Sequence, residues 1–175
     1  IHLLEGVAGK KMDWDLLKKQ VRNTQRLVEL GREIENYRKA IPSPMRGRKI
    51  QQLHWTEMCL MGEDEAVSFF ELVLGEIKER AEKGISAVPE EKHRLLTLFF
   101  PPVYSGKILD WMEREQGAVS VWECPGEYSS SEGDLDPEKP LESLAKWHRL
   151  TSFCAFYQGP LKREYVEHIA KAAIE

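Results

Sequence analysis

The stretch RLLTLFFPPVYSGKILDWMEREQGAVSVWE, residues 94–123, sets the fold class. Its first part, Arg94 to Phe100, is a short apolar run that is typical of a strand buried on both faces, and two prolines end it. An amphipathic helix from Ser105 to Gly117 and a second strand from Ala118 to Glu123 follow. The inward-facing residues of this helix are expected to be Ile108, Leu109 and Met112. Strand, helix and strand in this order predict two parallel strands joined by a right-handed crossover.

The residues before this unit, 1–92, are expected to form a helical segment. Its longest helix begins after Asp13, a good N-cap residue, and ends before Pro42, because the residue before a proline avoids the α region. The apolar face of this helix is expected to contain Leu16, Leu17, Val21, Thr24, Leu27, Val28, Gly31, Ile34 and Tyr37. A second helix is predicted from about Arg48 to Met61.

A third helix opens at GEDEAVSFF, residues 62–70, with acidic residues in its first turn, and ends at Gly84. Its apolar stripe is expected to contain Phe70, Val73, Leu74, Ile77 and Ala81. Its other charged residues are expected to form a solvated face: Glu76, Lys78, Glu79, Arg80, Glu82 and Lys83.

Two more helices are predicted after the second strand, with Pro140 and Pro160 near their first positions. A parallel sheet needs more than two strands to bury itself, so a further strand is expected beyond the last helix, and the chain is expected to be a piece of a longer protein. The predicted fold class is α/β and helix-rich overall. A helical segment, residues 1–92, precedes a partial parallel domain of the Rossmann or flavodoxin type, residues 93–175.

The composition is that of an ordinary globular protein. Of the 175 residues, 42% are apolar and 31% are charged, which argues against disorder. The net charge of -4 argues against a nucleic-acid binder, which needs a basic face. No apolar run is long enough for a transmembrane helix, and no signal peptide opens the chain, so a cytoplasmic protein without a membrane anchor is expected.

The loop that follows the second strand is the main candidate for a functional site. It leaves the carboxyl end of a parallel strand, where ligands bind in open α/β sheets. Within it, Cys124 is a candidate metal ligand, and Glu127, Tyr128 and Ser129 are candidate cofactor-binding residues. The alternative is a solvent-exposed connection, with Cys124 as a structural cysteine at the end of a strand. No catalytic residue is assigned.

Four other segments contain chemically capable residues without a complete motif. Ser105 to Lys107 places a lysine at a helix start, which could receive a phosphate, but no phosphate-binding glycine motif is present, so a plain cap is the alternative. MRGRK, residues 45–49, could meet an anion or could be a solvated turn. His54–Trp55 and Trp147–His148 have no carboxylate at a fixed spacing, so both are interpreted as packing or surface residues.

The three cysteines are widely spaced and contain no CxxC pair. This pattern suits a reducing compartment and does not make a self-contained zinc site. Cys59 on the second helix and Cys154 in a Phe-rich bend are interpreted as core residues.

Three stretches resemble the family of 2-hydroxyacyl-CoA dehydratases (2-hydroxyglutaryl-CoA dehydratase D-component) and benzoyl-CoA reductases. The first runs from EAVSFFELVLGEIKERAEKG to SVWE, residues 65–123. The second, DLDPEKPLESLAKWH, residues 134–148, is similar to an element after the second strand of that family. The third, residues 16–50, includes LGREIENYRKAIPSPMRG. The resemblance is extended rather than confined to one motif.

The resemblance implies an iron–sulfur enzyme that acts on acyl-CoA. Subunits of that family pair with a second subunit of the same family and carry [4Fe–4S] clusters bound by cysteine thiolates. An ATP-dependent iron–sulfur activator passes in one electron, which forms a ketyl radical of the CoA thioester. The radical permits elimination of water from a 2-hydroxyacyl-CoA, or ring reduction in the aryl branch.

The resemblance also implies that the cluster cysteines lie in parts of the family that this chain lacks. We therefore expect the isolated chain to hold no intact cluster and to be inactive. The alternative is a non-catalytic α/β binding or subunit-assembly module. An exposed parallel edge invites pairing with another copy, so a homodimer is expected.

Overall fold

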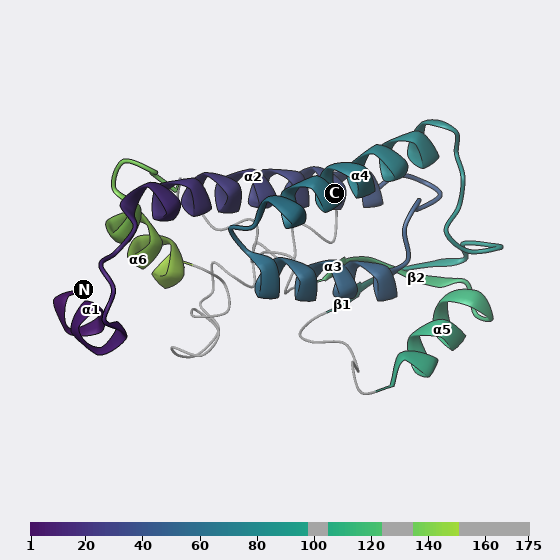
Figure 1. The fold of residues 1–175 in the computed structure, drawn as a ribbon. Coiled ribbons are helices and arrows are strands. Elements are labelled where there is room, and N and C mark those ends of the chain that lie inside the picture. The colour runs from purple at the N-terminus through teal and green to yellow at the C-terminus, as the bar shows by residue number, and fades with distance from the viewer. Residues whose placement is uncertain (98–104, 124–134, 151–175) are drawn as a thin grey trace.

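The computed structural model describes residues 1–97, 105–123 and 135–150, and these form a mostly helical molecule with a small parallel sheet (Figure 1). In chain order the elements are α1 His2–Ala8, α2 Trp14–Arg38, α3 Gly47–Leu60, α4 Asp64–Glu82, β1 His93–Thr97, α5 Gly106–Arg114, β2 Ala118–Glu123 and α6 Pro140–Leu150. No helix in these residues is long and apolar enough to cross a bilayer. The predicted helix that opens at Pro160 lies outside the described residues.

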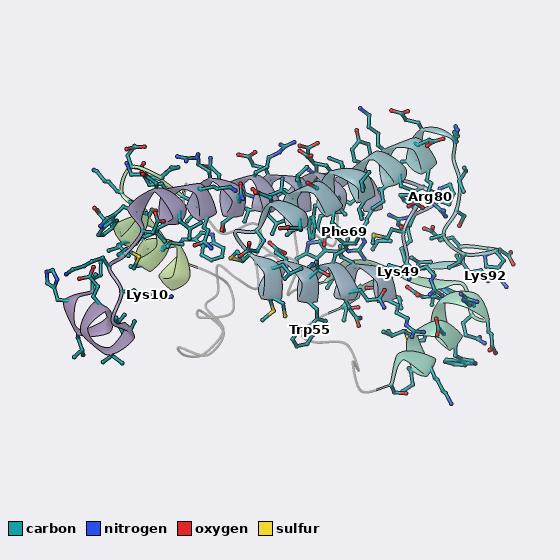
Figure 2. The ribbon with its side chains drawn as sticks, viewed as in Figure 1. Lys10, Lys49, Trp55, Phe69, Arg80 and Lys92 are labelled. Carbon is teal, nitrogen blue, oxygen red and sulfur yellow. The ribbon has the colours of Figure 1, made fainter. Side chains whose placement is uncertain are left out.

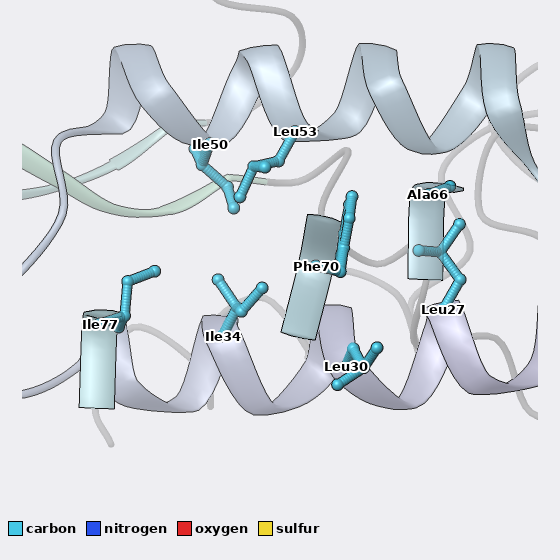
Figure 3. Packing of buried hydrophobic residues seen from close by; sticks show 8 residues of the cluster. All are labelled: Leu27, Leu30, Ile34, Ile50, Leu53, Ala66, Phe70 and Ile77. Atoms are coloured by element: carbon cyan, nitrogen blue, oxygen red, sulfur yellow. The ribbon is translucent and has the colours of Figure 1, made fainter. Parts of the chain in front are cut away.

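The long helices α2 and α4 lie side by side, and α3 runs alongside this pair and packs against it (Figure 1). The carboxylate of Asp13 accepts a hydrogen bond from the backbone N–H of Leu16 at 2.9 Å, so the predicted cap of α2 is confirmed. The core between the three helices consists of Leu27, Leu30, Ile34, Ile50, Leu53, Ala66, Phe70 and Ile77 (Figure 3). A smaller cluster joins α6 to α2 and consists of Val21, Val28, Leu135 and Trp147.

The predicted helix faces are largely confirmed, with two exceptions in the apolar faces and one in the solvated face. Leu16 is 51% exposed. The first residue of α4, Asp64, pairs with Lys19, so Leu16 lies about one turn beyond the end of the α2–α4 contact. Ile108 is 43% exposed, whereas its neighbour Leu109 is buried as predicted. Arg80 does not belong to a solvated face, because its guanidinium donates to two backbone carbonyls, those of Pro44 at 3.0 Å and Ser86 at 3.3 Å.

The two strands pair in parallel, as the strand–helix–strand order predicts, from His93 opposite Ala118 to Thr97 opposite Glu123. The prediction that the first strand is buried on both faces is wrong for its described residues. Its first two residues are exposed and its last three are half-buried. The sheet described has two strands, so β1 has a partner strand on one side alone within this part of the chain. Residues 98–100 of the predicted strand lie outside the described residues.

Gly117 enters β2 in a left-handed conformation, with φ at +65°. Its carbonyl accepts hydrogen bonds from the N–H groups of Lys92 at 2.9 Å and His93 at 3.0 Å. A Cβ at this position would lie 2.4 Å from the carbonyl oxygen of Glu90, so only glycine fits without a shift of the backbone.

We expect Gly117→Ala to lower the free energy of unfolding by about 2 kcal/mol, from the left-handed backbone and the clash together. Chemical denaturation followed by circular dichroism measures the loss. The matched control is Gly75→Ala in α4, where an added Cβ meets no atom within 4 Å and should stabilise the helix by about 0.5–1 kcal/mol. Equal effects of the two substitutions would contradict the structural role of Gly117.

Candidate functional site

The carboxyl edge of the sheet is the place where the sequence predicts a ligand. The hydroxyl group of Thr97, the last residue of β1, lies 2.7 Å from that of Ser120 in the middle of β2, and this contact joins the two strands. The loop candidates Cys124, Glu127, Tyr128 and Ser129 lie outside the described residues, so their role stays a prediction.

A buried polar cluster lies between α2, α3 and β2, and we call its four members, Glu35, Arg38, His54 and Glu57, the buried quartet. Arg38 is 0% exposed and donates to Glu35 Oε2 at 2.8 Å and to the carbonyl oxygen of Ser120 at 2.7 Å. The Oε1 atom of Glu35 lies 3.4 Å from His54 Nε2. The cluster therefore connects the helices to the second strand through charged side chains.

Glu57 is the most unusual member of the quartet. It is 3% exposed, and its Oε1 atom has no hydrogen-bond partner among the described residues. Burial raises the pKa of Glu57 to about 7; His54 acts in the opposite direction, and the Glu35 carboxylate adds to the rise. Burial also raises the pKa of Glu35, but Arg38 and His54 outweigh it, so that pKa lies below its usual value.

His54 is half-buried, in agreement with its interpretation as a packing residue, but it also lies close to a carboxylate that its sequence surroundings do not indicate. This carboxylate, that of Glu35, comes from a different helix, at a separation that no short motif records. A signal was present in the sequence, because Arg38, His54 and Glu57 each follow a core residue, Ile34, Ile50 or Leu53, by four positions. Polar residues at helix positions that face the core predict such a cluster.

Two of the three cations of MRGRK, residues 45–49, pair with α5. Arg46 donates to Asp110 Oδ1 at 3.0 Å, and Arg48 also pairs with Asp110. The alternative of a solvated turn is therefore wrong for both arginines. The anion that they meet is a carboxylate of this chain.

The side chain of Arg48 also packs against the first residue of α5. An added Cβ at Gly106 would lie 3.1 Å from the guanidinium carbon of Arg48, so the arginine packs directly against this helix N-terminus. Ser105 provides no side-chain cap. Because Asp110 already pairs with Arg48, the geometry here is that of a helix–helix contact and not of a phosphate site.

A groove of about 460 Å³ lies between α3 and α4. Residues around it include Lys49, Leu53, Phe69, Val73, Glu76 and Arg80. Figure 2 shows Lys49, Phe69 and Arg80 around the space between the two helices, whereas Trp55 points away from it. The groove has an apolar wall and charges of both signs at its rim, and no pattern in the sequence predicts it.

The model of the family described as 2-hydroxyglutaryl-CoA dehydratase, D-component, matches residues 1–175. The chain belongs to this family. No curated protein matches the D-component chain significantly. Membership in the family confirms the resemblance seen in the sequence and implies a 2-hydroxyacyl-CoA dehydratase-type function, which is that of a lyase, for the protein to which the chain belongs.

The described residues of this D-component chain do not fit an iron–sulfur cluster. Cys59 is the one cysteine among them, and it is exposed on α3, so its interpretation as a core residue is wrong. Cys124 and Cys154 lie outside the described residues. In residues 1–97, 105–123 and 135–150, no three His, Cys, Asp or Glu side chains are placed to hold a metal ion. A cluster needs several thiolates, which this part of the chain does not supply.

Proposed function

We propose that this chain is part of an iron–sulfur 2-hydroxyacyl-CoA dehydratase, which eliminates water from a 2-hydroxyacyl-CoA, or of a related benzoyl-CoA reductase. The observation that carries the proposal is the D-component family match along residues 1–175. In this proposal the protein acts in the cytoplasm on an acyl-CoA. It works with a second subunit of the same family and with an ATP-dependent iron–sulfur activator.

The 175 residues alone, in this proposal, hold no intact [4Fe–4S] cluster and have no dehydratase activity. The three cysteines of the chain are far apart in sequence, and the one that the structure describes stands on an exposed helix surface. A cluster therefore takes its thiolates at least partly from elsewhere in the assembled enzyme.

Activity of the complete protein tests the proposal. We expect the protein that contains this chain, co-expressed with its second subunit and the activator, to convert a 2-hydroxyacyl-CoA into the 2-enoyl-CoA when ATP and a reductant are supplied. Omission of the activator is the control and should abolish the conversion. If the complete system neither dehydrates 2-hydroxyacyl-CoA nor reduces benzoyl-CoA, the proposal fails.

The isolated chain provides the second arm of the experiment. After anaerobic incubation with iron and sulfide, we expect no stable visible absorption band of a cluster. A stable band that survives desalting would contradict the proposed absence of a cluster in the chain alone.

A non-catalytic assembly role is the second candidate, and exposed apolar side chains favour it. Leu3, Leu4 and Val7 of α1 are exposed, and α1 contains no buried residue. Each strand of the sheet has one neighbour in the described part of the chain, which leaves edges for a second copy or another subunit. If an acyl-CoA leaves the tryptophan fluorescence of the chain unchanged, that result favours the assembly role.

A further inference from the structure

The charge balance of the buried quartet is incomplete. Glu35 and Glu57 provide two carboxyl groups. Arg38 provides one permanent positive charge, and its guanidinium donates a hydrogen bond to Glu35 Oε2 at 2.8 Å. His54 is neutral unless it binds a proton. With both carboxyl groups ionised and His54 neutral, the quartet has a net charge of -1, and an uncompensated buried charge is costly. One bound proton makes the quartet neutral.

Contacts in the quartet determine which group takes this proton. Glu35 already lies beside two nitrogen atoms, one of Arg38 and one of His54, and both favour its ionised form. Glu57 Oε1 has neither a cation nor an N–H donor within hydrogen-bond distance among the described residues. A protonated carboxyl group at Glu57 therefore costs less than an ionised one.

The other elements around α3 do not supply the missing charge. From α4, the charged groups near α3 are Glu76 and Arg80, and these line the α3–α4 groove. Arg80 is already bound to two backbone carbonyls. From α5, Asp110 and Glu113 meet the N-terminal end of α3 and pair with arginines there. From β2, the group that faces the quartet is the carbonyl of Ser120.

We infer that Glu57 is a proton-binding switch, which holds α3 against α2 when its carboxyl group is protonated and loosens this contact when the group ionises. The switch is independent of the proposed dehydratase activity, because it rests on the packing of the quartet alone. Since α3 also forms one wall of the groove that contains Lys49 and Phe69, loss of the proton loosens that wall as well.

The direction of the pH effect follows from the raised pKa of Glu57, about 7, compared with its ordinary value of 4.5. Between these two values the folded chain binds more protons than the unfolded chain, so stability falls as the pH rises. Below this window the Glu57 carboxyl group is protonated in both the folded and the unfolded chain. Above the window its contribution to the free energy of unfolding is fully lost. The unfolding equilibrium constant is expected to rise about three hundredfold across the whole window from this group alone.

Glu57→Gln tests the switch, because glutamine has the shape of the protonated carboxyl group and does not titrate. Chemical denaturation of both proteins at pH 5 and pH 8 gives the comparison. We expect similar stability at pH 5 and an unfolding constant about a hundredfold smaller for the variant at pH 8. Glu82→Gln, an exposed carboxyl group on α4, is the matched control and should leave the pH dependence of the wild type unchanged.

Carbon-13 NMR of the Glu57 carboxyl group gives a second measurement that does not depend on how well the variant folds. A carboxyl resonance that titrates near neutral pH supports the switch. The inference is overturned if this resonance titrates in the usual acidic range, or if wild type and Glu57→Gln show the same dependence of stability on pH.

Discussion

Arg38→Met is expected to lower the free energy of unfolding by about 3–5 kcal/mol, the range typical of a buried ion pair that loses one partner. Methionine can fill much of the space of the aliphatic stem of Arg38, which is fully buried, but it donates no hydrogen bond. The substitution leaves the Glu35 carboxylate and the Ser120 carbonyl without the guanidinium that they contact at 2.8 Å and 2.7 Å. Because Ser120 belongs to β2, the loss also weakens the contact between the long helix and the sheet.

Denaturant unfolding of the purified chain measures this effect, and Arg22→Met is the control. Arg22 lies on the same helix but is exposed, so its replacement should change stability by less than about 0.5 kcal/mol. The double variant Arg38→Met with Glu35→Leu removes both charges, and it should recover part of the lost stability, because a pair of apolar residues leaves no unpaired buried charge. A double variant that is less stable than the sum of the two single effects would contradict this explanation.

Much of the fold was predictable because its signals are local. The Asp13 cap, the 3–4 spacing of apolar residues in α2 and α4, and the strand–helix–strand order of residues 94–123 each lie within a few turns of chain. Helix type and parallel pairing depend on such short-range patterns. The Rossmann or flavodoxin type stays a prediction, because the order of further strands defines it and the described sheet has two strands.

The polar contacts were not predictable from short-range patterns. Glu35 and His54 are brought together by the antiparallel course of α2 and α3, and Arg46 meets Asp110 across 64 positions. Within one helix, charged residues three or four positions apart look like an ordinary solvated face. The available signal for burial was the position of Arg38 and Glu57, because each follows a buried apolar residue by four positions and so faces the core.

The contact between α3 and α5 leads to the second large effect. Glu113 is 2% exposed, and its Oε1 atom accepts a hydrogen bond from the backbone N–H of Gly47, the first residue of α3, at 2.6 Å. Its Oε2 atom lies 3.8 Å from Arg46 Nε. The residue before α3, Arg46, provides no side-chain cap, so a carboxylate from a distant helix satisfies this helix N-terminus and complements its dipole.

We expect Glu113→Ala to lower the free energy of unfolding by about 2–4 kcal/mol, because it leaves the buried Gly47 N–H without its acceptor and removes one of the two carboxylates near Arg46, which keeps its hydrogen bond to Asp110. Glu113→Gln keeps an oxygen for the Gly47 N–H but loses the charge, so we expect about half of that loss. Glu115→Ala, at an exposed carboxylate just after the same helix, is the control and should have little effect. Denaturant unfolding gives all three values, and equal stability of Glu113→Ala and wild type would contradict the capping role.

Hydrogen exchange of the Glu113→Ala variant also tests the proposed division of the chain at residues 92 and 93. Glu113 lies after this boundary and Gly47 before it, so their hydrogen bond crosses the boundary. If the two parts unfold as one cooperative unit, α2 and α4 should lose protection together with β1 and β2, because the substitution lowers the stability of the whole unit. If the parts are independent domains, α2 and α4 should keep their protection, since their shared core around Phe70 does not contain Glu113. The extent of the loss along the chain therefore shows whether this carboxylate connects two domains or belongs to a single core.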